Sequence, residues 1–183
     1  LTATQTFTVV VLETNAAPLL APIADQKIHA GMTLILTNQV QDFDWPPNTL
    51  AFELAAGSPL TASIGPADGV FTWTPTDADA NTVQSVTVRA TDDGVPPVAA
   101  EQTFLVTVAS RPLITDIQVD AGQVVLTWTS LSGRAYRLQS CTNLDNPEWF
   151  DATPEVVAGG PFTSTTNILD AASLNLLRVR VVP

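Results

Sequence analysis

The chain has 183 residues, of which 45% are hydrophobic, and its 18 acidic and 7 basic residues give a formal net charge of −11. A chain this acidic repels phosphate groups. Neither nucleic acid nor an anionic membrane is therefore expected as a partner. No stretch approaches the ~20 apolar residues of a membrane-spanning helix. The single cysteine, Cys141, allows no internal disulfide.

The chain opens with a predicted extra strand. Residues Thr4–Leu12 alternate in the manner of a strand, and Pro18 keeps the following linker extended. The segment Gln5–Val11 closely matches Gln102–Val108, which lies 97 residues later, about the length of one β-sandwich domain. Residues 1–14 are therefore predicted to be a strand and linker that resemble the end of a preceding domain.

Residues 15–110 show short period-2 segments separated by turns rich in Gly, Pro, Asn and Asp. Strands are predicted at Lys27–Ala30, Thr33–Thr37, Leu50–Ala55, Thr61–Ile64, Gly69–Thr74, Val83–Thr91 and Glu101–Val108. This number and spacing of strands is typical of a Greek-key sandwich.

Residues 111–183 resume the same alternation after Ser110-Arg111-Pro112. Strands are predicted at Ile114–Val119, Val124–Ser130, Ala135–Ser140, Glu148–Ala152, Phe162–Asn167 and Leu176–Val182. The predicted fold is all-β: two Greek-key Ig-like β-sandwiches in tandem, with an extra N-terminal strand.

Three motifs between residues 13 and 110 resemble a cadherin-like repeat of the dystroglycan and bacterial immunoglobulin-like kind. They are the linker Asn15–Pro18, the loop Gln41–Asn48 and the segment Arg89–Pro97. The mid-domain segment Gly65–Pro75 also resembles that family.

The resemblance implies a calcium site. The implied ligands are Asp42, Asp44, Asp92 and Asn15, with Asn48 as a further candidate through its backbone and Glu13 as a weaker one. Ca²⁺ prefers six to eight oxygen ligands in flexible geometry. The alternative is that these aspartates only cap turns. The linkers lack the family's additional aspartates, so a complete triple-calcium joint is not expected.

The second sandwich is similar to a divergent fibronectin type III domain of bacterial surface proteins. Val124–Trp128, Tyr136–Ser140 and Leu177–Val181 carry this resemblance. In that fold one more edge strand follows the last of these segments. Because the sequence ends at Pro183, we expect that strand to be missing.

A spare strand at one end and a vacant strand position at the other predict strand donation between molecules. Thr4–Leu12 of one molecule would complete residues 112–183 of the next, with Thr6, Phe7, Val9 and Val11 as donor residues. Such a contact is heterologous and extends into a filament. The alternative is a fragment of a larger surface protein built from tandem modules.

Neither alternative is an enzyme. His29 is the only histidine and has no catalytic motif nearby, and one Cys with one His cannot form a closed zinc site. Trp73 and Trp128 are predicted to fill the two cores, whereas Trp45 is a candidate platform for stacking on sugars. The chain is therefore predicted to be an extracellular, cell-surface structural or adhesive protein whose partners are copies of itself or neighbouring domains. A carbohydrate-binding accessory module is the remaining alternative.

Overall fold

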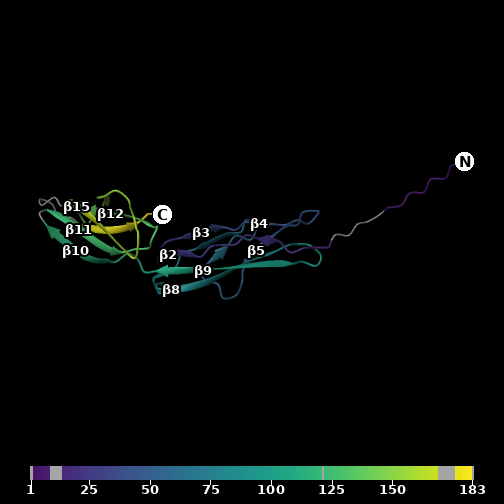
Figure 1. The fold of residues 1–183 in the computed structure, drawn as a ribbon, viewed down its shortest axis with the longest axis horizontal. Helices are drawn as coiled ribbons and strands as arrows, with labels where there is room; N and C mark the ends of the chain where they lie inside the picture. The colour runs from purple at the N-terminus through teal and green to yellow at the C-terminus, as the bar shows by residue number, and fades with distance from the viewer. Residues whose placement is uncertain (1, 9–13, 121, 169–175, 183) are drawn as a thin grey trace. The chain divides into compact units, whose positions relative to one another are not determined.

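The computed structural model describes residues 2–8, 14–120, 122–168 and 176–182. The chain divides into two compact units, the first made of Leu1–Ala24, Ile35–Trp73 and Ser85–Leu105 and the second of Asp25–Leu34, Thr74–Gln84 and Val106–Pro183. Strands make up almost all regular structure (Figure 1). Among these residues no helix is long and apolar enough to cross a membrane.

The region up to residue 109 contains three sheets and one short 3-10 helix, η1 (Asp77–Asp79). Its strands are β1 (Leu19–Leu20), β2 (Gln26–His29), β3 (Leu34–Thr37), β4 (Val40–Gln41), β5 (Ala51–Leu54), β6 (Ser63–Ile64), β7 (Val70–Trp73), β8 (Thr82–Thr91) and β9 (Ala99–Ala109). They form sheets in the orders β2-β9-β8-β5, β3-β7-β6 and β1-β4. β2 runs parallel to β9, whereas β5 and β8 are antiparallel.

Alternation along β9 explains how this region builds its core. Phe104, Val106 and Val108 are almost completely buried, whereas Leu105 between them is exposed. Successive strand residues point to opposite faces, so one face of β9 packs inward. Phe104 meets Phe71 edge to face at 5.7 Å between ring centroids, a favourable aromatic geometry.

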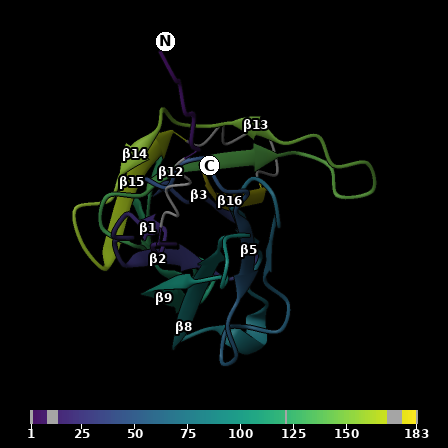
Figure 2. The same ribbon diagram turned by 90° about the vertical axis from the view of Figure 1, so that its right-hand side faces the viewer.

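The region from residue 114 onward forms two sheets (Figure 2). Its strands are β10 (Ile114–Asp120), β11 (Gln123–Thr129), β12 (Ala135–Cys141), β13 (Phe150–Asp151), β14 (Val156–Val157), β15 (Phe162–Ile168) and β16 (Leu176–Val181). One sheet has the order β10-β11-β15; in the other, β12 pairs with β13, β14 and β16. Trp128, Tyr136 and Leu138 are fully buried, and Val179 and Val181 of β16 pack against this core.

The predicted all-β class and Ig-like sandwich architecture are confirmed. Each strand predicted between residues 27 and 182 has a counterpart, and Trp73 and Trp128 are buried in the cores as expected. The predicted domain boundaries, at residues 14/15 and 110/111, stay predictions.

Candidate functional site

The structure brings together five of the predicted calcium ligands in the first unit. They form what we call the polar loop cluster: Asn15, Asp42, Asp44, Asn48 and Asp92. Asn15 comes from the linker before β1, three members from the loop after β4, and Asp92 from the loop between β8 and β9. Glu13 lies outside the described residues.

Asp92 is the most buried acid of the cluster, with 4% of its surface exposed. Its Oδ1 accepts hydrogen bonds from the Asn15 amide at 2.9 Å and from the backbone N–H groups of Gly94 and Val98 at 3.1 and 2.9 Å. Burial alone would raise the pKa of this carboxyl. The three hydrogen bonds stabilise the carboxylate more strongly, so the pKa of Asp92 lies below its usual value. The side chain is therefore an anion at neutral pH.

Asp44 joins the linker to the loop after β4. Its Oδ2 accepts hydrogen bonds from the Ala16 N–H at 2.9 Å and from the Asn48 amide at 3.1 Å. The Asn48 amide also donates to Asn15 Oδ1 at 2.8 Å, and Asp42 Oδ1 accepts the Asp44 N–H at 2.9 Å. These bonds hold the side chains of the cluster together.

Two carboxylate oxygens of the cluster bear on whether a cation fits there. Asp42 Oδ2 and Asp92 Oδ2 are buried and accept no hydrogen bond from any described group. Leaving carboxylate oxygens buried without partners is costly, and a hard cation would satisfy them. Within the described ranges no three His, Cys, Asp or Glu side chains converge on one metal position. A cation here would need asparagine, backbone or water oxygens besides the carboxylates.

Three further residues support the cluster and were not predicted. Asp93 Oδ1 accepts the Thr49 N–H at 2.7 Å, which ties the two loops together, and the Pro96 carbonyl accepts a hydrogen bond from Asn15 at 2.8 Å. At Gly94 a Cβ would collide with the Asn15 side chain, which explains why a glycine stands there. The Asp-Asp-Gly spacing was visible in the sequence, but the partner of Asp93 was not.

Large apolar side chains project from the same two loops. Phe43, Trp45 and Val95 are 75%, 78% and 92% exposed. The exposure of Trp45 agrees with its predicted position on the surface. Its role as a ligand platform stays a prediction.

In the second unit, β16 has one unpaired edge. It pairs with β12 from Tyr136↔Val181 to Cys141↔Leu176, and no strand in the described part of the chain pairs with its other edge. A groove of about 500 Å³ lies beside the strand, lined by His29, Met32, Arg111, Pro112 and β16 residues 178–181. No residue of β12 lines this groove.

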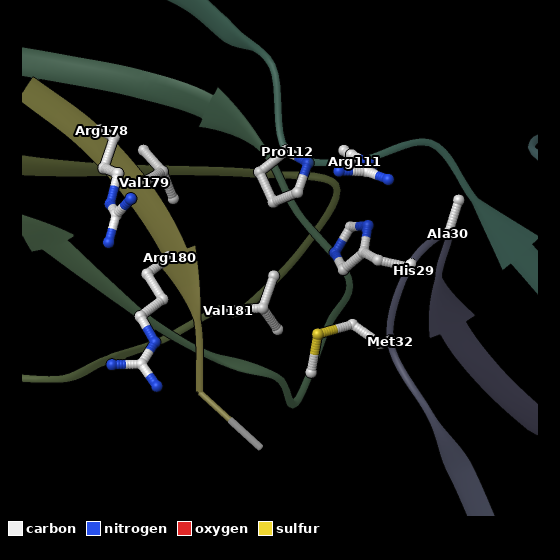
Figure 3. Close-up of a pocket in the computed structure, with 10 residues that line it drawn as sticks. His29, Ala30, Met32, Arg111, Pro112, Arg178, Val179, Arg180 and Val181 are labelled. Carbon is white, nitrogen blue, oxygen red and sulfur yellow. The ribbon is translucent and has the colours of Figure 1, made fainter. Parts of the chain in front are cut away.

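Figure 3 shows how the two faces of β16 differ beside this groove. Val179 and Val181 lie toward Pro112 and Met32, whereas Arg178 and Arg180 extend to the opposite side. Arg178 donates to Gln139 Oε1 at 3.0 and 2.8 Å and stacks 4.1 Å from the Trp149 ring centroid. Neither arginine has a carboxylate hydrogen-bond partner among the described residues. The groove thus has an apolar floor and a basic rim.

Only some of the predicted donor residues are among the residues that the structure describes. Thr6 and Phe7 belong to residues 2–8, which are exposed and pair with no strand in the described single chain. Phe7 is 84% exposed. Val9 and Val11 lie outside the described residues. Pairing with a second molecule stays a prediction.

His29 is buried in the second unit and takes part in a hydrogen-bond network that the sequence did not reveal. Its Nδ1 is 2.5 Å from the Ser110 carbonyl oxygen and its Nε2 is 2.6 Å from the Tyr136 hydroxyl, which in turn accepts the Leu131 N–H at 2.7 Å. His29 and Tyr136 are 107 residues apart, so no local pattern links them. These contacts give His29 a structural role.

The sheets and their buried cores define an immunoglobulin-like β-sandwich protein. A family model described as "Putative Ig domain" matches residues 17–109, just over half of the chain. The chain belongs to this family. No curated protein matches it.

Solved structures of Ig and cadherin proteins align with this chain. The N-terminal eight Ig domains of Down syndrome cell adhesion molecule align over 92% of this chain and 27% of theirs, with 17% identity and a TM-score of 0.43. Human CDH23 EC21-23 aligns over 65% of this chain and 47% of its own, with 20% identity and a TM-score of 0.44. The chain therefore spans less than half the length of either structure.

Proposed function

We propose that the chain is a non-enzymatic, extracellular structural or adhesive protein that assembles head to tail through its N-terminal strand. The observation that carries this proposal is the free edge of β16, which offers backbone hydrogen-bonding groups to an added strand. The exposed residues 2–8 belong to the segment that would fill this edge in the next molecule. Such a heterologous contact extends into a filament.

The match between the N-terminal segment and β9 supports the choice of donor. When the two sequences are aligned, Phe7, Val9 and Val11 match Phe104, Val106 and Val108. The latter three are the buried residues of β9. A segment with this pattern is suited to the last strand of an Ig-like sandwich. The same side chains would enter the core of the acceptor sandwich.

The same match also favours a second candidate function. Residues 5–11 would be the last strand of a preceding repeat if the chain is one part of a larger surface protein built from tandem modules. The chain would then contribute adhesion or spacing rather than self-assembly. Exposed Trp45 leaves carbohydrate binding as a further alternative for such a module.

Calcium at the polar loop cluster belongs to the same proposal. Asp42, Asp44 and Asp92 would supply carboxylate oxygens, with Asn15, Asn48 and Glu13 as additional ligands. The buried partner-free oxygens Asp42 Oδ2 and Asp92 Oδ2 support it. A bound cation would stiffen the linker where one molecule joins the next.

Light scattering at several concentrations tests the assembly. The full chain should form large species, and a version lacking Leu1–Leu12 should stay near the 19.3 kDa monomer, because the donor strand has been removed. Circular dichroism would confirm that the shortened chain keeps its β-structure. A full chain that remains monomeric would contradict self-assembly and favour the tandem-module function.

A further inference from the structure

We infer that the groove beside β16 is the receptor for one side chain, Phe7 of a second copy of this chain, which anchors the donated strand. This inference rests on the proposed head-to-tail assembly and names the contact that gives it specificity. It concerns residue 7, which the structure describes, and a groove that lies wholly within the second unit.

The shape and chemistry of the groove suit an aromatic side chain. Val179, Val181, Met32 and Pro112 supply apolar surface, and the volume of about 500 Å³ exceeds that of one phenyl ring (Figure 3). Val179 and Val181 already pack against the core of the second unit. A ring placed here would therefore extend that core instead of lying on a polar surface.

Phe7 is the aromatic residue that strand donation would bring to this position. It is the only aromatic residue in the first 18 and is 84% exposed in the single chain. Its counterpart in β9, Phe104, is 1% exposed and packs against Phe71. The phenylalanine at the matching position of β9 is therefore a core residue of this chain.

Charge also favours another copy as the occupant. Arg178 and Arg180 line the groove, and neither donates a hydrogen bond to a carboxylate among the described residues. A basic rim favours an acidic partner over a basic one, and a second copy of this chain has a net charge of −11.

Cross-linking tests the contact directly. We would place the photoreactive analogue benzoylphenylalanine at position 7 and irradiate a mixture of this chain with isotope-labelled wild type. The expected cross-links join labelled and unlabelled copies and map to residues 27–34, 111–112 or 176–182. Cross-links confined to one copy, or mapping elsewhere, would overturn the inference.

Substitution separates this inference from the proposed function. Phe7→Ala should raise the protein concentration required for assembly at least tenfold. Phe150→Ala, which removes another exposed phenylalanine, should leave that concentration unchanged. Met32→Glu should act like Phe7→Ala because it places a carboxylate in the groove. If loss of Leu1–Leu12 abolishes assembly but Phe7→Ala does not, the anchor is wrong and strand donation stands. If the wild-type chain never assembles, both fall.

Discussion

The lone histidine shows how one buried residue makes stability depend on pH. Desolvation disfavours the imidazolium and lowers the pKa of His29 below 6.5, and the nearby Arg134 acts in the same direction, whereas the Ser110 carbonyl opposes them. A neutral ring can donate from Nδ1 to Ser110 and accept the Tyr136 hydroxyl at Nε2. Protonation of Nε2 would make this nitrogen a donor and leave the hydroxyl hydrogen without its acceptor.

The predicted consequence is a loss of stability in mild acid. Between the lowered folded pKa and the unfolded value of about 6.5, the unfolded chain binds more protons than the folded chain. The free energy of unfolding is therefore highest above about pH 6.5 and falls as the pH drops toward the folded pKa. Denaturant unfolding between pH 7.5 and 5.5 measures this, and no other histidine contributes to that window.

A variant with His29→Gln gives the matched control. It should be less stable at pH 7.5 by about 1–3 kcal/mol, because the flexible amide does not reproduce the geometry in which the imidazole ring bridges the Ser110 carbonyl and the buried Tyr136 hydroxyl. Its stability should nevertheless change less than that of the wild type between pH 7.5 and 5.5. Parallel curves for the two proteins would show that His29 does not titrate on unfolding in this range.

Strands were predicted best from the sequence where the alternation of apolar and polar residues is long. β8, β9 and β11 alternate over seven or more residues, and their inward faces could be predicted from the sequence. The two-residue strands β1, β4 and β14 were missed because such short segments show no period. Their existence depends on a partner strand, which the local sequence does not contain.

The candidate site was predictable to the same limited extent. The spacing of Asp42, Asp44 and Asp92 identified the residues through resemblance, and the structure brings their loops together through Asn15 and Asn48. The Asp93 bond to Thr49 and the contact between His29 and Tyr136 link distant segments. A single sequence carries no signal for such pairs.

The polar loop cluster leads to a calcium prediction. We expect a dissociation constant of about 10⁻⁴ to 10⁻³ M, the range of extracellular calcium-binding modules. Calcium at ten times that constant should raise the free energy of unfolding by about 1.4 kcal/mol, measured by thermal melting with calcium or with chelator. Asp92→Asn should abolish this gain, whereas Asp145→Asn, with the same change of charge in the second unit, should keep it. Equal melting with and without calcium would favour the role of these aspartates as turn caps.

For the whole molecule, the question is whether the free edge of β16 is filled by another chain. Edge strands are a hazard for uncontrolled association, and proteins usually protect them with charges or short length. β16 has Arg178 and Arg180 on its outer face, which limits random pairing but suits a partner with acids beside its strand. The same edge can therefore be both protected and selective.

A peptide with the sequence of residues 1–14 should act as a competitor for this edge. Added in excess to the full chain, it should occupy β16 and reduce the scattering mass to that of one chain with one peptide, because each acceptor can hold one donor strand. A scrambled peptide of identical composition should leave the assemblies intact, since it lacks the alternation that places Phe7, Val9 and Val11 on one face. If both peptides act alike, association depends on general hydrophobicity rather than on register. If neither acts, the molecules join through another surface, and β16 keeps its edge free.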